Sequence, residues 1–365
     1  MGYRQHLLRS LLAIRAQGGL QLQSGDQLWP EIVLVGRSNN KLREIAHRHG
    51  LSEWSTDLDA ALQRTDVEIY FDAQPTALRK DAVRAAIEAG KHCYTEKPTA
   101  QNLVDAIELA ELADHAGIKH GVVHDRLFQP GLRKLKRLMR SGFFGRILSI
   151  CGEFGYWVFE GDWQSGQRPS WNYRRETGGL VIDMMPHWHY VLRLFGPLTA
   201  VTAHVVTHIP QRWDEAGMAY SATADDAAYV IVEIGDGIVA QLHSSWTARV
   251  HRDELFEFQV DGTDGSAVVG LHGCRIQHRV TTPRPAWDPD LPVMEDFRAQ
   301  WQEVPDNMAF DNGFKVQWEL FLRHVAEDAP YRWDFWSGAG GVQMAELVLR
   351  SSQERRRLVI PPLSK

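Results

Sequence analysis

The stretch KHCYTEKP, residues 91–98, decides how this chain is interpreted. Residues 91–94 are predicted to form a short β-strand, which ends before Pro98. Glu96 and Lys97 then fall at the C-terminal end of that strand, the edge where ligands bind in open α/β sheets. An ammonium group there can orient a substrate hydroxyl and stabilise negative charge that develops on oxygen. The alternative is a solvent-exposed Glu-Lys pair in a turn, so the rest of the sequence has to distinguish the two.

Strands and helices alternate through the first third of the chain. The apolar runs at residues 31–35, 67–71 and 118–123 are predicted strands, in addition to the strand at 91–94. Helices are predicted over residues 3–16, 39–48, 76–89 and 103–115. This alternation indicates βαβ units and a parallel sheet. The first helix is rich in arginine and has no acidic residue, a composition that is also typical of a transit peptide.

The pattern changes after about residue 124. Two apolar runs flank Gly235-Asp236-Gly237, which is the signal of a tight hairpin. In residues 254–260 apolar and polar side chains alternate, as in a sheet with one wet face. Helices are predicted near residues 310–326 and 342–352, after an irregular, proline-rich segment. The predicted fold class is therefore α/β, with a parallel-sheet domain at 1–124 followed by an α+β domain with a large open antiparallel sheet at 125–365.

The composition is that of a globular protein. Of the 365 residues, 44% are hydrophobic and 24% are charged, which is enough for two domains with their own cores. The net charge of −6 argues against nucleic acid or an anionic membrane as a partner, and no apolar run approaches the length of a membrane span. The three scattered cysteines are in no metal-binding spacing, so we expect a reducing, cytoplasmic setting and no metal site.

A second informative stretch is GGLVIDMMPH, residues 178–187. Because proline is tolerated in a helix only in its first turn, Pro186 predicts a helix that starts near Asp183. Asp183 and His187 are four residues apart and therefore share one face of that helix. A carboxylate beside an imidazole raises its basicity, which suits a general base. An ordinary N-cap aspartate with a nearby histidine is the alternative, and the two glycines indicate a close backbone approach.

Together these stretches resemble the glucose–fructose oxidoreductase/inositol dehydrogenase (Gfo/Idh/MocA) family, and the similarity runs over nearly the whole chain. Residues 96–98 are similar to the family's Glu-Lys-Pro motif, in which the lysine contacts substrate and the nicotinamide ribose. Residues 178–187 resemble its Gly-Gly-x3-Asp-x-Gly-x-His motif. Residues 73–76 resemble its cofactor-contacting Ala-Thr-Pro-Asn turn, and residues 342–346 its closing helix.

The resemblance implies a Rossmann domain and a set of site residues. The catalytic residues that it implies are Lys97, Asp183 and His187. The cofactor is expected to contact Gly2, Arg37, Ser38, Gln74, Pro75, Thr76, Glu96, Lys97 and Pro98. The substrate is expected to contact Lys97, Trp171, Tyr173, Asp183 and His187. In these roles His187 is the proton acceptor, and Asp183 orients a substrate hydroxyl or His187.

The implied activity is that of an NAD(P)-dependent oxidoreductase. It would transfer a hydride between nicotinamide and a hydroxyl or keto carbon of a sugar, cyclitol or related polyol. Two alternatives remain at this point, an NAD-dependent glycoside hydrolase of the same family and a cofactor-free sugar-binding or regulatory protein. The family's open sheet implies a homodimer or homotetramer. Two departures from the motif, Met185 for glycine and Tyr190 for a common aspartate, are expected to reshape the substrate pocket.

A larger departure lies at the start of the chain. A dinucleotide fold opens with an apolar strand and a glycine-rich turn that leads into its first helix. Here Met1-Gly2-Tyr3 stands directly before that helix, and Gly2 resembles the last glycine of the family's turn. We expect Met1 to be an internal methionine of a longer protein whose first strand lies in the centre of the sheet.

The end of the second strand bears on the choice of cofactor. An acidic residue there binds the ribose 2′-hydroxyl of NAD, whereas an arginine accommodates the 2′-phosphate of NADP. The chain has Arg37 and Ser38 in this position and no acid, which predicts NADP, with NAD as the second possibility. A solvated loop arginine is the alternative.

Aromatic residues are frequent before residue 178, and sugar rings stack on such side chains. They are Tyr156, Trp157, Phe159, Trp163, Trp171 and Tyr173. Arg168, Arg174 and Arg175 add hydrogen-bond donors. These residues predict a carbohydrate or cyclitol pocket, and packing in the core or at an interface is the alternative for each of them.

Overall fold

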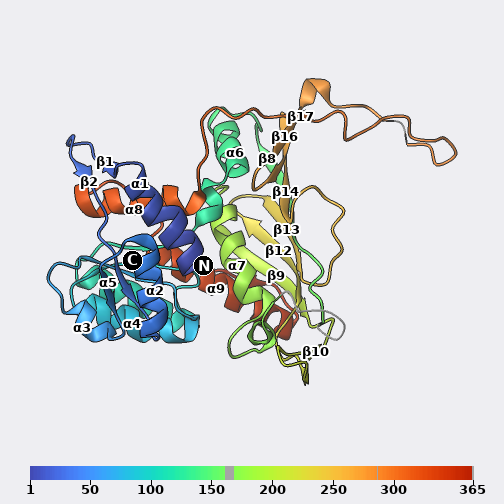
Figure 1. The fold of residues 1–365 in the computed structure, drawn as a ribbon. Coiled ribbons are helices and arrows are strands. Elements are labelled where there is room, and N and C mark those ends of the chain that lie inside the picture. The colour runs from blue at the N-terminus through green and yellow to red at the C-terminus, as the bar shows by residue number, and fades with distance from the viewer. Residues whose placement is uncertain (161–167, 286, 364–365) are drawn as a thin grey trace. The chain divides into compact units, whose positions relative to one another are not determined.

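The computed structural model describes residues 1–160, 168–285 and 287–363 (Figure 1). These residues form two compact units. The first unit comprises Met1–Asp125 and Asp311–Gln343 together with Leu363, and the second comprises the described residues of Arg126–Phe310 and Met344–Pro362. Trp163 lies outside the described residues.

The first unit contains two parallel ladders of strands. One joins β3 (Val33–Val35) to β4 (Glu53–Ser55), and the other joins β5 (Ile69–Asp72), β6 (His92–Thr95) and β7 (His120–Val122). Both are parallel, as the sequence predicts. Among the described residues β3 and β5 are not paired with each other. A short antiparallel pair, β1 (Leu20–Gln21) with β2 (Gln27–Leu28), precedes them.

Helices alternate with these strands. The chain starts with the π-helix η1 (Gly2–Leu11), which continues into α1 (Leu12–Ala16) and confirms the helix predicted over residues 3–16. The helices that follow are α2 (Asn39–His49), α3 (Leu58–Leu62), α4 (Thr76–Glu88) and α5 (Leu103–His115). Ser38 rather than Asn39 caps α2, since the Ser38 hydroxyl accepts a hydrogen bond from the Lys41 backbone.

Helix α8 (Gly313–Glu327), which precedes the last described helix, belongs to the core of the first unit. Its Phe321 ring stacks on Tyr94 of β6 with the ring centroids 4.7 Å apart, and its Trp318 ring meets Tyr94 edge-on. Ile14 of α1 belongs to the same cluster of buried side chains. The first and the penultimate helical segments of the chain therefore pack together over the middle strand of the parallel ladder.

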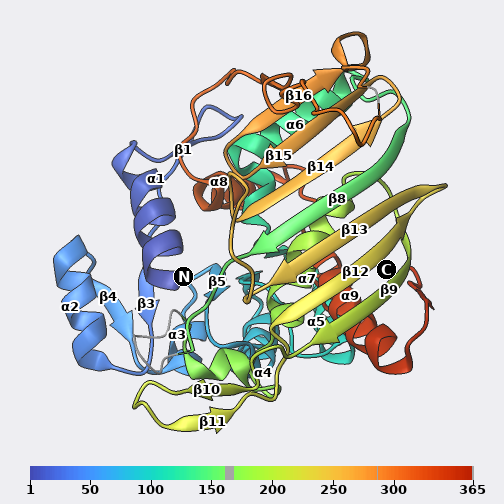
Figure 2. The ribbon, with the colours of Figure 1, turned by 90° about the vertical axis from the view of Figure 1, so that its right-hand side faces the viewer.

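The second unit is built on a large sheet, which Figure 2 shows face-on. Its described strands lie in the order β17-β16-β15-β14-β8-β13-β12-β9-β18. Their bounds are β8 (Ile147–Gly155), β9 (Leu198–Val206), β12 (Ala227–Ile234), β13 (Ile238–Ser245), β14 (Phe256–Gly262), β15 (Gly265–Gly270), β16 (Cys274–His278), β17 (Gln302–Glu303) and β18 (Leu358–Val359). All neighbours are antiparallel except β8 and β13, which are parallel, so the predicted antiparallel sheet is mixed at one point.

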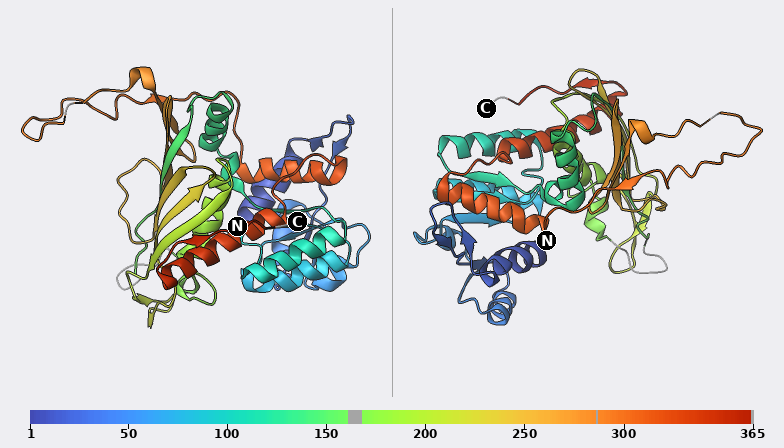
Figure 3. Two further views of the ribbon diagram at one scale, coloured as in Figure 1. Left: turned by 180° about the vertical axis from the view of Figure 1, so that it is seen from behind. Right: turned by 90° about the horizontal axis from the view of Figure 1, so that it is seen from above.

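Helices cover one face of this sheet and leave the other open, as the edge-on views show (Figure 3). Helices α6 (Pro130–Arg140) and α7 (Leu180–Leu192) lie on the covered face. Two serines of α9 (Phe335–Glu354) also reach this sheet, with the Ser351 hydroxyl accepting from the β9 backbone at 3.0 Å. On the open face Tyr229, Ile231 and Val239 are exposed.

The packing of α7 on the sheet depends on a glycine. A Cβ atom at Gly152 in β8 would lie 2.6 Å from the Trp188 ring of α7, so only glycine leaves room for that indole. The Trp188 ring stacks on Phe256 and donates a hydrogen bond to Ser244 at 2.9 Å. These contacts fix the helix that carries the second predicted motif.

The remaining elements of the second unit are short. They are η2 (Asp125–Phe128), η3 (Ser170–Tyr173), η4 (Arg279–Thr281) and the antiparallel pair β10 (Gln211–Trp213) and β11 (Ala219–Ser221). The described residues between η4 and β17 form the irregular segment expected from its prolines and project from the sheet (Figure 1). In the part of the chain that the structure describes, no helix is long and apolar enough to cross a membrane.

Candidate active site

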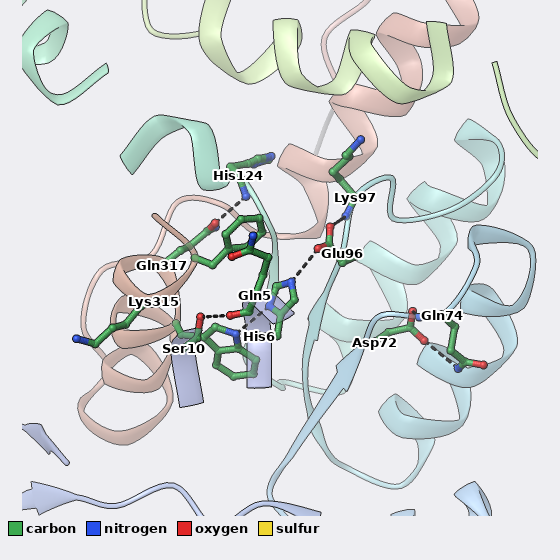
Figure 4. A network of polar contacts seen from close by, with 12 residues as sticks. Gln5, His6, Ser10, Asp72, Gln74, Glu96, Lys97, His124, Lys315 and Gln317 are labelled. Atoms are coloured by element: carbon green, nitrogen blue, oxygen red, sulfur yellow. Dashed lines mark hydrogen bonds and ion pairs between the residues drawn. The ribbon is translucent and has the colours of Figure 1, made fainter. Parts of the chain in front are cut away.

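The Glu-Lys-Pro stretch directly follows β6, at the C-terminal end of that parallel strand (Figure 4). The Glu96 backbone N–H donates to the carbonyl of Asp72 at the end of β5, at 2.9 Å. The Lys97 backbone N–H donates to the Glu96 carboxylate at 3.2 Å. In Figure 4 the Lys97 side chain points away from that carboxylate. The ends of β5 and β6 are therefore joined just where the lysine leaves the sheet.

The Glu96 carboxylate is buried and paired with His6 of η1. The His6 Nε2 atom lies 2.8 Å from the Glu96 Oε1 atom, and the Trp318 indole N–H donates to His6 Nδ1 at 3.0 Å. Because an indole can only donate, His6 Nδ1 is the acceptor. The proton of His6 is then on Nε2, which donates a hydrogen bond to Glu96. Burial alone would raise the pKa of Glu96, but the bond from His6 and the charge of Lys97 outweigh it, and its pKa lies below the usual value.

The turn after β5 is held by a buried ion pair. The Arg79 Nε atom of α4 lies 2.8 Å from the Asp72 carboxylate, and both side chains are almost fully buried. Arg79 also donates to the carbonyl of Gln74 at 2.7 Å and to the carbonyl of Pro98. The Gln74 backbone N–H donates in turn to Asp72 at 3.1 Å. The structure thus brings the predicted cofactor residues of this turn together with Glu96 and Pro98.

Of the other predicted cofactor residues, Gly2 joins this group and two do not. A Cβ atom at Gly2 would lie 3.1 Å from the Cβ of Ala73, so the start of η1 approaches the turn closely. Pro75 precedes α4, and Thr76 is its first residue. Arg37 and Ser38 follow β3 in the other ladder, where Arg37 is exposed and Ser38 caps α2.

The second predicted motif forms the start of α7 in the second unit. The helix begins at Leu180, three residues earlier than Pro186 predicts, and the predicted start near Asp183 is wrong. The reason is a distant cap, because the Asp225 carboxylate accepts from the Val181 N–H at 2.7 Å. Asp225 also pairs with Arg175 at 2.6 Å. Pro186 consequently lies inside the helix.

Steric constraints explain why both residues before α7 are glycines. A Cβ atom at Gly178 would lie 2.6 Å from the Asn172 carbonyl oxygen, and Gly179 has a φ of 129° with Asp225 beside it. The close backbone approach predicted from these glycines is confirmed. It places Asp225 against the first turn of the helix that carries Asp183.

Asp183 and His187 have different partners. The Arg168 Nη2 atom lies 3.2 Å from the Asp183 carboxylate. His187 is buried, and its Nδ1 atom lies 2.5 Å from the hydroxyl of Tyr190, one turn further along α7. Tyr190 is the residue that stands where the family commonly has aspartate, and here it meets the imidazole.

Aromatic and cationic side chains alternate beside Asp183. The Arg168 guanidinium lies over the Trp246 ring at 4.2 Å, Trp246 meets Tyr173 edge-on, and Arg212 lies over the Tyr173 ring at 3.9 Å. Among the described residues the Tyr173 hydroxyl has no hydrogen-bond partner although it is buried, and burial raises the pKa of this phenol. A polar group in that state is available to a bound hydroxyl or a water. Trp171 is half exposed beside it.

Sequence reasoning missed four residues that hold the two motifs: His6 and Arg79 in the first unit, and Asp225 and Tyr190 in the second. His6, Arg79 and Asp225 each contact a partner more than six positions away in the sequence, so no local spacing rule predicts these contacts. Tyr190 was visible as a departure from the family motif, and its contact with His187 was not predicted. Among the described residues no group of three or more His, Cys, Asp or Glu side chains could hold a metal ion.

Comparison with known proteins gives matches to two family models. The model described as "Oxidoreductase family, NAD-binding Rossmann fold" matches residues 15–124, and the model of the GFO/IDH/MocA C-terminal domain matches residues 132–268. The chain is 57% identical over 370 residues to D-xylose dehydrogenase of Paenarthrobacter nicotinovorans, covering 100% of this chain and 95% of that protein.

More distant relatives agree with these matches. Levoglucosan dehydrogenase of Pseudarthrobacter phenanthrenivorans is 26% identical over 264 residues, or 66% of each chain. The solved structure of a levoglucosan dehydrogenase in complex with NADH and L-sorbose superposes with a TM-score of 0.78 at 19% identity, over 97% of this chain and 95% of that one. At that identity the superposition establishes the fold alone.

The glycine before α7 yields a stability prediction. Gly178→Ala is expected to destabilise the protein by about 2 kcal/mol or more, because the new methyl group meets fixed backbone. Gly273→Ala is the matched control, since its Cβ would make only an ordinary contact at 3.5 Å, and it should cost less than about 1 kcal/mol. Urea unfolding followed by circular dichroism measures both. Equal midpoints for the two variants would contradict the steric account.

Proposed function

The chain belongs to the Gfo/Idh/MocA oxidoreductase family, and within that family we propose that it oxidises D-xylose, with Lys97, Asp183 and His187 as its catalytic residues. It is an NAD(P)-dependent oxidoreductase that acts on a CH–OH group of a sugar. The observation that carries the choice of sugar is the 57% identity with D-xylose dehydrogenase over the whole of this chain. The same identity favours a dehydrogenase over the NAD-dependent glycoside hydrolase considered above.

The first unit has features that fit a dinucleotide. No side chain caps the start of η1 and its first turn contains no acid, so the backbone N–H groups of that turn suit a phosphate. Glycine at position 2 adds no side chain where the helix start approaches Ala73. When bound, nicotinamide supplies the acceptor for the hydride. Residues Gln74, Pro75, Thr76, Glu96 and Pro98 would line it from the ends of β5 and β6.

Proton transfer falls to His187. The Tyr190 oxygen can accept the Nδ1 proton of His187 at 2.5 Å, and in that tautomer Nε2 is the nitrogen that takes the proton of the substrate hydroxyl. Histidine is the side chain that most often serves as a general base at neutral pH, whereas lysine is more often a fixed positive charge. Lys97 stabilises the charge that develops on the substrate oxygen.

Asp183 and the aromatic residues bind the sugar in this proposal. Asp183, held by Arg168 at 3.2 Å, accepts a hydrogen bond from a substrate hydroxyl. The unpaired hydroxyl of Tyr173 supplies a donor, and the half-exposed ring of Trp171 offers an apolar face for the ring of the sugar.

Lys97→Met tests the catalytic assignment. It removes the ammonium group and keeps the apolar stem, so kcat for D-xylose oxidation should fall on the order of 10²–10³-fold, measured as NAD(P)H formation. Lys119→Met is the control, because Lys119 pairs with Asp328 on the surface, and its kcat should match the wild type. A near-normal kcat in Lys97→Met refutes the assignment. Sugar turnover without net NAD(P)H would indicate the hydrolase instead.

The preferred cofactor is NADP in this proposal. The support is the exposed Arg37 at the end of β3, with no acid between β3 and α2 to bind a 2′-hydroxyl. A guanidinium there can form a charge-assisted bond with the 2′-phosphate.

Arg37→Asp is expected to reverse this preference. The KM for NADP should rise tenfold or more, because one charge-assisted bond is worth roughly 1.5–3 kcal/mol, while the KM for NAD should fall or stay the same. Arg43→Asp, on the exposed surface of α2, controls for the change of net charge. A wild-type protein with a clear preference for NAD would disprove the NADP proposal.

The open face of the large sheet is the proposed contact between copies of a homodimer or homotetramer. Tyr229 and Ile231 on β12 and Val239 on β13 are 42–48% exposed, an apolar stripe on an uncovered sheet. Ile231→Asp should therefore lower the mass measured by light scattering to that of the monomer. Val104→Asp changes an apolar residue on α5 that is still more exposed, and it should not lower the mass. A wild-type monomer at micromolar concentration contradicts this proposal.

A cytoplasmic location completes the proposal. The three cysteines are free thiols, two of them buried, which suits a reducing compartment. Recovery of the activity in the soluble cytoplasmic fraction of gently lysed cells would agree with it, and recovery outside the cell would not.

A further inference from the structure

We propose that His6 and Arg79 are positioning residues for Lys97, and that they act by fixing the residues on either side of it. The proposal rests on the catalytic role proposed for Lys97. It concerns side chains of the first unit alone, which come from η1 and α4 and meet at the end of β6 (Figure 4).

On the N-terminal side the fixed residue is Glu96. Its carboxylate is bound by His6 through Oε1 at 2.8 Å and by the Lys97 backbone through Oε2 at 3.2 Å. His6 itself cannot turn, because Trp318 donates to its other nitrogen and the Phe71 ring lies 4.3 Å from the imidazole. A rigid imidazole thus determines where the Lys97 backbone N–H must point.

On the C-terminal side the fixed residue is Pro98. Its carbonyl accepts a hydrogen bond from the Arg79 guanidinium, which is 2% exposed. The other guanidinium bonds go to Asp72 at 2.8 Å and to the carbonyl of Gln74 at 2.7 Å. A planar guanidinium with three oxygen partners in different directions has little freedom. Pro98 is therefore held relative to the turn after β5.

Asp72 joins the two sides. Its carbonyl accepts the Glu96 N–H, and its carboxylate accepts from Arg79, from the Gln74 N–H and from the Tyr70 hydroxyl. The backbone from which the Lys97 side chain extends is consequently held by hydrogen bonds on both sides. Displacement of a reacting group by about 1 Å can cost on the order of 10²-fold in rate, so this rigidity bears on kcat.

A purely structural role is the competing explanation, and the first unit contains a matched control for it. His120 of β7 is also buried, its Nε2 lies 3.0 Å from the Asp114 carboxylate, and its Nδ1 accepts the Phe335 backbone N–H at 3.0 Å. The hydrogen bonds are of the same kind, with the Asp114 side chain 44% exposed and that of Glu96 10% exposed. His120 pairs with Cys93, near the start of β6, whereas Lys97 follows the other end.

The experiment compares His6→Phe, His6→Gln and His120→Phe in the full chain. Phenylalanine keeps the ring and removes both hydrogen bonds, whereas glutamine can still donate to Glu96 from a position close to that of Nε2. We expect kcat to fall roughly 10–100-fold in His6→Phe and to recover most of the way in His6→Gln. His120→Phe should lose similar thermal stability and retain at least half of the wild-type kcat.

A second readout does not depend on activity. Trace acetylation with acetic anhydride, quantified by peptide mass spectrometry, gives the reactivity of Lys97 relative to the exposed Lys41. This ratio should change at least threefold in His6→Phe and in Arg79→Met, less in Arg79→Lys, and not in His120→Phe. If His6→Phe does not fold, the Arg79 pair provides the same test.

The outcomes separate this proposal from the one on which it rests. If Lys97→Met is inactive while His6→Phe and Arg79→Met match His120→Phe in both kcat and acetylation ratio, the positioning proposal is wrong and the role of Lys97 stands. If the ratio changes as expected while Lys97→Met keeps its kcat, the positioning is supported and the catalytic role of Lys97 is lost.

Discussion

The pairing of buried carboxylates is the constraint on which the first unit depends. A carboxylate that is removed from water must be met by a charge or by several donors, because leaving it unpaired costs more than most single contacts contribute. Asp72 and Glu96 are both buried at the C-terminal ends of neighbouring strands. Arg79 and His6 meet them from two separate helices. The fold of this unit therefore converges on the edge where the Glu-Lys-Pro stretch emerges, and the rigidity of that edge follows from electrostatics.

The second unit also contains a buried carboxylate that needs partners, at the start of α7. Asp225 is buried, and it is satisfied by the first turn of the helix and by Arg175. That arrangement requires two glycines, since any side chain at Gly178 or Gly179 would displace the backbone or the cap. The glycines, the cap and the placement of Asp183 in the first turn are thus parts of one local structure. A family motif that pairs glycines with an aspartate and a histidine has a physical reason here.

Many features of the fold were predictable because they depend on residues close together in the sequence. The alternation of strands and helices, the parallel ladder, the hairpin at Gly235 and the crowding at the two glycines all follow from short-range patterns. The start of α7 was not, because Asp225 stands 44 positions after the Val181 N–H that it accepts. His6 and Glu96 are 90 positions apart and Trp318 lies 312 positions beyond His6, so no spacing rule could join them. Local sequence patterns therefore predicted where the two motifs lie, whereas contacts between distant residues determine how their side chains are held.

Tyr190 shows how a departure from a family motif can be read physically. An aspartate beside an imidazole would accept its Nδ1 proton and would also add a negative charge that strengthens the base. A phenol at 2.5 Å can accept the same proton and adds no charge. Tyr190 can therefore orient the His187 ring without adding the negative charge that would raise its basicity. The nearby carboxylate, Asp183, is partly neutralised by Arg168. In the role proposed for His187, the tyrosine therefore preserves the orientation of the imidazole and removes one negative charge from a buried site, where each unpaired charge is costly.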